Sequence, residues 1–258
     1  MNTSDYQSLL SEFRDSAHKM MFSNSTIDAF SSGSTVRQIN AVMRMLSMEL
    51  DTRAENKRCR LLRQAAFPAI KSIDDFDFSG IQFPEGYTKE DLSSLAFLDM
   101  AENLVLYGPS GRGKTHLAVA LGILAANSGR SVRFYTAADL VYALSAAHRS
   151  NTLEKIYAQI ERADILLIDE FGYIPFDGEG SRLLFQVISK CYETRSLVFT
   201  TNIEFSRWGT VLGDDKLAAA AIDRVVHHGR LITFTGPNRR MENALMMNGK
   251  QHDAAKMA

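Results

Sequence analysis

The residues with the clearest chemistry form the run Gly-Pro-Ser-Gly-Arg-Gly-Lys-Thr at positions 108–115. An apolar segment, 104–107, precedes this run, and a helix-like segment, 117–121, follows it. Glycines let backbone N–H groups approach a polyphosphate closely, and a helix start adds partial positive charge at the same point. Lys114 can reach the terminal phosphates, and the Thr115 hydroxyl can ligate Mg²⁺. The sequence therefore predicts a strand, a phosphate-binding loop and a helix, in that order.

This loop supplies the first set of predicted nucleotide contacts. We expect them from Gly108, Pro109, Ser110, Gly111, Arg112, Gly113, Lys114, Thr115 and His116. His116 lies on the helix after the loop, where we expect its ring to pack and not to act in catalysis. A tight turn with incidental Lys and Thr is the alternative interpretation, and the flanking strand and helix patterns argue against it.

Two carboxylates follow a second apolar segment, Ile165–Ile168. We expect Asp169 to stand beside the phosphate-binding loop and to hold Mg²⁺ together with Thr115. Glu170 is then the predicted base that orients and deprotonates the attacking water. A buried strand with a solvated end is the alternative interpretation of this pattern. The adjacent glutamate favours hydrolysis of a nucleotide over phosphoryl transfer to a small molecule, so the sequence predicts a nucleotide-hydrolysing enzyme that uses Mg²⁺.

Two further polar residues complete the predicted catalytic set of Lys114, Glu170, Asn202 and Arg224. Asn202 ends a third apolar segment and can hydrogen-bond the γ-phosphate or the water, as a sensor. Arg224 lies in the helical run 218–226 and can project into a neighbouring subunit's nucleotide, where it would stabilise transition-state charge. A strand-ending turn for Asn202 and a surface salt bridge for Arg224 are the simpler alternatives.

Alternating strands and helices must position these residues. From residue 103 onward the pattern predicts strands at 104–107, 132–135, 165–169, 197–201 and 231–234. Helices are predicted between them, at 115–127, 139–148, 153–162 and 181–194. Such alternation is typical of an α/β fold with a parallel sheet covered by helices on both faces.

Helices and a connector precede this core. We expect a helix from about residue 4 to 17, a polar connection at Asn24–Gly33, and a long helix from Ser34 to Gln64 that Pro68 ends. Residues 72–102 read as irregular structure with a short helix near 89–101. The predicted division is therefore an N-terminal helical domain at 1–70, a connector at 71–102, an ATPase domain at 103–250 and a disordered tail at 251–258.

Charge is unevenly distributed, although the net charge of the chain is only −1. From Arg37 to Arg63 seven Lys or Arg residues face three acids, and from Asp74 to Glu102 Lys89 is the only base. An excess of Arg and Lys favours contacts to DNA phosphates without sequence readout. We take Arg53, Lys57, Arg58, Arg60 and Arg63 as candidate contacts to double-stranded DNA. A solvated helical face is the alternative.

The remaining composition argues against secretion and membranes. No apolar run approaches the length of a membrane span, and the first residues lack the pattern of a signal peptide. Cys59 and Cys191 have no metal-ligand spacing, and neither do His148, His227 and His228, so we assign no metal beyond the nucleotide-bound Mg²⁺. We expect a cytoplasmic protein with no membrane partner.

Several blocks resemble IstB, the ATP-binding helper of certain insertion sequences. They are 108–118, Leu-Leu-Ile-Asp-Glu-Phe-Gly-Tyr at 166–173, 183–189, Thr-Thr-Asn-Ile-Glu-Phe-Ser-Arg-Trp at 200–208, and Ala-Ile-Asp-Arg-Val-Val-His-His at 221–228. The resemblance covers roughly residues 35 to 245. The blocks at 171–173 and 205–208 are more specific than any phosphate-binding loop.

The resemblance implies an AAA+ P-loop ATPase with a five-stranded parallel sheet in the order 5-1-4-3-2. It also implies a homo-oligomer with ATP sites shared between subunits, DNA binding, and a partner IstA-like transposase whose target selection ATP controls. By position, Lys114 and Thr115 then belong to Walker A, and Asp169 and Glu170 to Walker B. Asn202 becomes sensor 1, and Arg224 becomes the arginine finger.

The chain departs from the family pattern at two places. Cys191 stands where the family usually has Arg before Tyr-Glu, and Asn238-Arg239-Arg240 replaces Ser-Tyr-Arg, so Arg239 or Arg240 can take the role of the terminal arginine.

Three other functions remain open. A DnaC-like helicase loader would use the N-terminal helices to hold a helicase; the basic helix and the Tyr-Ile-Pro segment after Glu170 favour the transposition helper. A small-molecule phosphotransferase and an architectural DNA-binding protein are disfavoured by the intact Lys114, Asp169 and Glu170.

Overall fold

The computed structural model describes residues 3–242. These residues form two compact units, one running to Arg60 and the other starting at Leu61. The predicted tail at 251–258 lies outside the described residues. Among the described residues, no helix has the length and apolar character needed to cross a bilayer.

Helices alone build the first unit: α1 (Thr3–Lys19), α2 (Asn24–Gly33) and most of α3 (Val36–Ala65). Its small core contains Phe13, Ala17 and Ile27, together with Ile39 and Leu46 of α3. The prediction of a connection at Asn24–Gly33 was wrong. Ser23 caps α2 by accepting a bond from the Thr26 N–H, and burial of Ile27 fixes the helix against the core. Few apolar residues in a polar segment hid this helix.

The long helix α3 matches its prediction closely and crosses from one unit into the other. It ends at Ala65, where Ala66 takes a left-handed φ of +58° and Pro68 follows. Leu61 and Ala65 already belong to the core of the second unit, which is why the division falls inside the helix. The domain boundary near residue 70 stays a prediction.

A six-stranded sheet forms the centre of the second unit, in the order β1-β6-β2-β5-β4-β3. Its strands are β1 (Ile81–Gln82), β2 (Asn103–Tyr107), β3 (Val132–Thr136), β4 (Ile165–Phe171), β5 (Ser196–Thr201) and β6 (Gly229–Phe234). The strands β2 to β6 are parallel and, numbered along the chain, have the expected order 5-1-4-3-2. Strand β1, which pairs antiparallel with β6, was not predicted because it has only two residues.

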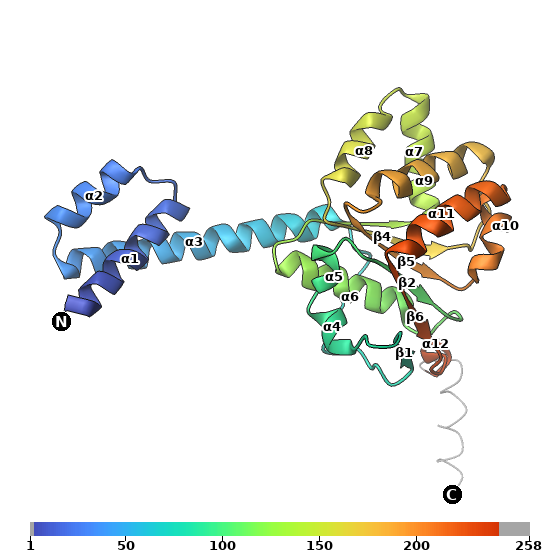
Figure 1. The fold of residues 1–258 in the computed structure, drawn as a ribbon, viewed down its shortest axis with the longest axis horizontal. Helices are drawn as coiled ribbons and strands as arrows, with labels where there is room; N and C mark the ends of the chain where they lie inside the picture. The colour runs from blue at the N-terminus through green and yellow to red at the C-terminus, as the bar shows by residue number, and fades with distance from the viewer. Residues whose placement is uncertain (1–2, 243–258) are drawn as a thin grey trace, which may run out of the picture. The chain divides into compact units, whose positions relative to one another are not determined.

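Helices cover both faces of this sheet (Figure 1). One face packs against the end of α3, α4 (Lys89–Ser93), α5 (Ala96–Asp99) and α6 (Lys114–Asn127). The other packs against α7 (Ala137–Arg149), α8 (Leu153–Glu161), α9 (Gly178–Cys191), α10 (Trp208–Leu212) and α11 (Asp215–His227). A 3₁₀ turn at Phe205–Arg207 leads into α10, and α12 (Arg239–Glu242) ends the described chain.

Strand alternation separates the two cores. Leu104 and Leu106 of β2 face the α6 side, whereas Val105 between them faces the opposite side. Successive side chains of a strand point to opposite faces, so a parallel strand covered on both sides reads as a continuous apolar run. That is why the apolar runs could be identified as strands from the sequence.

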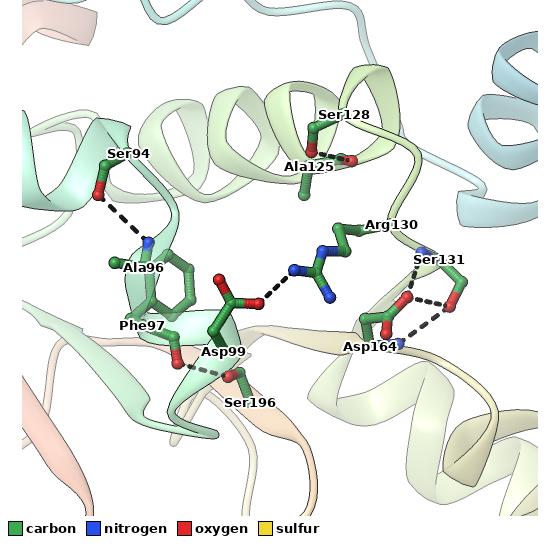
Figure 2. Close-up of polar contacts among 10 residues, drawn as sticks. All are labelled: Ser94, Ala96, Phe97, Asp99, Ala125, Ser128, Arg130, Ser131, Asp164 and Ser196. Atoms are coloured by element: carbon green, nitrogen blue, oxygen red, sulfur yellow. Dashed lines mark hydrogen bonds and ion pairs between the residues drawn. The ribbon is translucent and has the colours of Figure 1, made fainter. Parts of the chain in front are cut away.

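A cluster of polar contacts joins the amino ends of β3, β4 and β5 to each other and to neighbouring segments (Figure 2). The Asp164 carboxylate accepts bonds from the N–H and the hydroxyl of Ser131, both at 2.7 Å, which joins the starts of β3 and β4. Ser196, which begins β5, donates to the Phe97 carbonyl at 3.3 Å, and Arg130 pairs with Asp99. These contacts hold the amino ends of β3, β4 and β5 in place.

Candidate active site

The phosphate-binding loop lies between β2 and α6, as predicted. Gly111 and Gly113 adopt left-handed φ values of +80° and +94°, which only glycine takes without strain. A Cβ at Gly111 would also stand 2.1 Å from Oδ1 of Asn238, so the loop has no room for a side chain there. Gly113 caps α6, whose first N–H groups are therefore available to an anion.

Lys114 begins α6, and its side chain turns back over the loop. Its Nζ donates to the carbonyls of Gly108 and Pro109 at 2.7 and 2.8 Å, and the residue is only 7% exposed. Burial lowers the pKa of this ammonium to about 8; the Asp169 carboxylate opposes that shift, and the Arg240 and Arg112 guanidinium groups add to it. Lys114 is thus a buried cation held by carbonyls, at the place where a phosphate would offer better partners.

Asp169 stands at the carboxyl end of β4 beside the loop. Its Oδ1 accepts bonds from the hydroxyls of Thr115 at 2.9 Å and Thr200 at 2.5 Å, and the residue is 5% exposed. Carboxylate and hydroxyl oxygens are the hard donors that Mg²⁺ selects, so this pair fits a nucleotide-bound Mg²⁺. When bound, the ion would add positive charge beside the phosphates.

A β-bulge in β4 brings the second carboxylate to the same side. Ile168 pairs with Phe199 and Phe171 pairs with Thr201, so Asp169 and Glu170 together face the single residue Thr200. Glu170 takes a left-handed φ of +58°, and its N–H donates to the Thr200 hydroxyl at 2.9 Å. In a regular strand Asp169 and Glu170 would point to opposite faces. The bulge re-aims Glu170, which is exposed and lines the pocket.

These groups surround a pocket of about 450 Å³, within the size range of small-molecule sites. Its walls come from the loop and α6, from the segment after α3, from the ends of β4 and β5, and from α12. The lining residues are Pro68, Ala69, Lys71, Ser110, Gly111, Gly113, Lys114, Thr115, His116, Val119, Glu170, Tyr173, Thr200, Arg239 and Arg240.

Two aromatic contacts brace the pocket. The Tyr173 hydroxyl, from the turn after β4, donates to Oγ of Ser110 at 3.0 Å and so joins this turn to the phosphate-binding loop. His116 packs edge-on against Phe76, with ring centroids 5.3 Å apart. These contacts hold Ser110, Tyr173 and His116, which line the pocket, in place.

The two C-terminal arginines, which sequence alone left interchangeable, differ in the structure. Arg239 donates its backbone N–H to the Gly111 carbonyl at 3.0 Å, and its guanidinium pairs with Asp77 at 2.7 Å. Arg240 lines the pocket and makes no ion pair with any described residue. Both arginines line the pocket; Arg239 also anchors the segment through Gly111 and Asp77, which leaves Arg240 as the cation that has no ion pair among the described residues.

Two predicted catalytic residues lie outside this pocket. Asn202 directly follows β5, is exposed and is not among the lining residues. Arg224 on α11 lies with its guanidinium 4.9 Å over the Phe185 ring and donates to the Ala220 carbonyl at 2.8 Å. Neither contributes to the pocket of its own chain, and their roles as sensor and finger stay predictions.

The candidate DNA contacts all lie on α3. Arg53 pairs with Glu49 at 2.7 Å and Arg58 pairs with Glu55 at 2.6 Å, along the helix. Lys57 and Arg60 are exposed and make no ion pair with a described residue, and Arg63 is also exposed. The helix therefore carries both neutralised and unneutralised cations.

Comparison with known proteins decides the family. The model of the family described as IstB-like ATP binding protein matches residues 18–246. The chain belongs to this IstB-like family. One relative, named as an ATP-binding protein of insertion sequence IS232 from Bacillus thuringiensis subsp. berliner, is 38% identical over 83% of this chain and 86% of its own length. The corresponding protein of IS5376 from Geobacillus stearothermophilus is 34% identical over 82% of this chain and 84% of its own.

Solved structures show the same fold at low sequence identity. AMPPCP-bound DnaA from Aquifex aeolicus aligns with a TM-score of 0.53 and 18% identity, covering 73% of this chain and 56% of its own. The predicted α/β fold is thereby confirmed for this IstB-like chain, and the description of its family identifies it as ATP-binding.

Sequence reasoning missed Thr200 and Asn103. The Thr200 hydroxyl donates to the Asp169 carboxylate and accepts from the Glu170 N–H, yet a threonine inside an apolar strand is typical of an ordinary strand residue. The Asn103 amide donates to the Val225 carbonyl at 3.2 Å and accepts from the Leu197 N–H at 2.9 Å, which ties α11 to the sheet. Its only sequence signal is a polar residue at the start of a buried strand.

Proposed function

We propose that this IstB-like chain is an ATP-dependent, DNA-binding transposition helper. It hydrolyses ATP at the interfaces of a homo-oligomer assembled on double-stranded DNA, and it directs a partner IstA-like transposase. The proposal rests on one observation: the Thr200 hydroxyl donates to the Asp169 carboxylate and accepts from the Glu170 N–H, which places both residues beside Lys114. The names of the relatives, which refer to insertion sequences, support the partner class.

Hydrolysis follows from the separate roles of the two carboxylates. Asp169 is buried and accepts hydrogen bonds from two hydroxyls, which hold its carboxylate beside the loop, where it can bind Mg²⁺. Glu170 is exposed in the pocket and is free of that task, so it can take a proton from water. Lys114 and Arg240 stabilise charge on the phosphates.

The site requires a neighbouring subunit to complete it. Within one chain, Arg224 lies over Phe185 and outside the pocket. In the proposed oligomer Arg224 leaves this ring and reaches the γ-phosphate of the adjacent subunit, where an arginine finger accelerates hydrolysis strongly. Asn202 acts as the sensor of the γ-phosphate state.

DNA binding uses above all Lys57 and Arg60 of α3, which make no ion pair with a described residue. Replacing Lys57 and Arg60 by Gln removes two phosphate contacts. The negative slope of log affinity against log salt concentration should therefore become shallower by about 1.8. The matched control replaces Arg53 and Arg58, which Glu49 and Glu55 already neutralise, and has a smaller effect. No effect of either pair would place the DNA contacts elsewhere, and equal losses from both pairs would contradict the distinction between paired and unpaired cations.

Light scattering with and without ATP and duplex DNA, combined with a phosphate-release assay, tests the proposal. We expect ATP and DNA together to produce an oligomer that releases phosphate without an added acceptor. Lys114→Ala should lose both properties. Failure of the wild-type protein to release phosphate in any state would refute hydrolysis. Assembly with a replicative helicase in place of a transposase would instead support the helicase-loader alternative.

A further inference from the structure

A histidine-rich corner lies where α9 and α11 end. Glu193, His227 and His228 each offer one ligand atom here, and these atoms all lie within 4.8 Å of one another. The two histidines alone lack metal-ligand spacing, so the sequence predicted no metal at this place. The fold adds a third ligand from the turn after α9, a distant part of the chain.

The contacts within this corner match the spacing of ligands around one ion. His228 Nε2 lies 3.2 Å from Glu193 Oε1, and the rings of His227 and His228 are edge to face with centroids 4.4 Å apart. Two ligands on a tetrahedral zinc, with bonds of about 2.0–2.1 Å, stand about 3.3 Å apart. The pair therefore needs little movement to hold an ion between its two atoms.

A neighbouring hydroxyl orients one of the rings. The Tyr192 hydroxyl lies 2.9 Å from Nδ1 of His227, which leaves Nε2 of that ring available to an ion. Metal-binding histidines commonly use their second nitrogen in such a contact, which fixes the ring and its tautomer.

The local field also favours a cation. Helix α9 ends at Cys191 and α11 ends at His227, so the carbonyl ends of both helices lie beside the corner. Helix C-termini carry partial negative charge, and Glu193 adds a full carboxylate. Glu193 adopts a left-handed φ of +58°, a conformation that non-glycine residues disfavour, in the same turn that directs its carboxylate to His228.

We propose that Glu193, His227 and His228 form a binding site for a divalent transition-metal ion, with Zn²⁺ as the ion that best suits two imidazoles and one carboxylate. Water completes the coordination, because Glu193 and His227 are exposed. The ion would tie the end of α9 to α11 one turn after Arg224. That consequence for the finger rests on the proposed function, whereas the site itself does not.

The same contacts could serve as hydrogen bonds without a metal, and the substitution Glu193→Gln distinguishes the two cases. Glu193→Gln keeps an oxygen that can accept a bond from His228, but it removes the charge and the strong ligand. His228→Asn removes an imidazole at a partly exposed position. His148→Asn is the matched control, since His148 pairs with Glu179 at 2.8 Å on the surface and belongs to no group of three metal ligands among the described residues.

Titration of the full-length, tag-free, chelator-treated protein with Co²⁺ and then Zn²⁺ tests the proposal. Millimolar Mg²⁺ is kept present to fill the oxygen-ligand site at Thr115 and Asp169. We expect visible absorption bands that saturate at one Co²⁺ per chain and disappear on addition of Zn²⁺. Glu193→Gln and His228→Asn should weaken binding by more than about 100-fold, since even changes around metal ligands cost 10–100-fold. His148→Asn should bind like wild type.

Absence of bands and of zinc uptake in the wild type would overturn the site. Unchanged binding in both Glu193→Gln and His228→Asn would do the same. Circular dichroism verifies that the variants are folded. The titration needs neither ATP nor DNA, so its failure would leave the proposed function untouched.

Discussion

Replacing Thr200 by valine removes one hydroxyl without changing the shape of the side chain. That hydroxyl donates to Asp169 at 2.5 Å and accepts the Glu170 N–H at 2.9 Å, opposite the bulge in β4. Thr200 is 2% exposed, so water cannot easily replace the lost contacts. The substitution thus tests whether one strand residue aims both carboxylates.

Thr200→Val should lower both the free energy of unfolding and kcat. Loss of a hydrogen bond to an ionised carboxylate and loss of the acceptor for a partly buried N–H together lower the free energy of unfolding by about 3 kcal/mol. For a chain of this size that corresponds to a fall in Tm of roughly 6–12 °C. The bulge is then free to relax, and a displacement of Glu170 by about 1 Å lowers kcat by about 100-fold.

Calorimetry, ATP-binding titration and phosphate release measure these effects separately. ATP affinity should change little, because Lys114 and the loop amides are untouched. The matched control is Thr201→Val: Thr201 is 1% exposed and its hydroxyl donates to the Phe171 carbonyl at 2.8 Å. Because the same hydroxyl also accepts from the Ile203 N–H at 3.2 Å, this variant loses two neutral hydrogen bonds, about 2 kcal/mol, and should keep its turnover.

The reasoning would be refuted by a Thr200→Val protein that turns over ATP like wild type. Equal losses of turnover in Thr200→Val and Thr201→Val would also refute it, because they would show a general effect of weakening β5. A normal Tm with lost turnover would leave the positioning role in place but contradict the energy assigned to the two bonds.

Four further predictions concern the pocket. Below about pH 8 Lys114 is protonated both before and after ATP binds. Above that pH the binding of ATP must also protonate Lys114, so ATP affinity should fall about tenfold per pH unit. An ATP affinity that stays constant up to about pH 9.5 would contradict this. Glu170→Gln should bind ATP normally but release phosphate about 10²–10⁴-fold more slowly, measured by single-turnover hydrolysis. Arg240→Ala should lower ATP affinity by roughly 10–100-fold through one lost charge-assisted bond. Arg239→Ala should instead lower the melting temperature, by freeing the segment from Asp77.

Sequence predicts well those parts of this protein whose residues are neighbours along the chain. The loop at 108–115 and the pair Asp169-Glu170 could be found because backbone amides, a lysine and two carboxylates act within a few residues of strand ends. The five parallel strands were visible because strands buried on both faces are continuously apolar. The helix α2 and the strand β1 were missed, since one lacks a wide apolar face and the other is too short to show a pattern.

Contacts between distant segments escaped prediction because sheet register decides them. Nothing in the run 197–202 indicates that Thr200, and not Asn202, lines the pocket. That follows from the pairing of Phe199 with Ile168 and from the bulge that places Asp169 and Glu170 opposite Thr200. In the same way, Glu193 meets His228 only because α9 and α11 end side by side. A bulge that depends on a neighbouring strand makes the catalytic geometry sensitive to β5, the strand that leads to Asn202. In the proposed function, with Asn202 as sensor and Glu170 as base, a movement of Asn202 would therefore be transmitted along β5 to Thr200 and from there to Glu170.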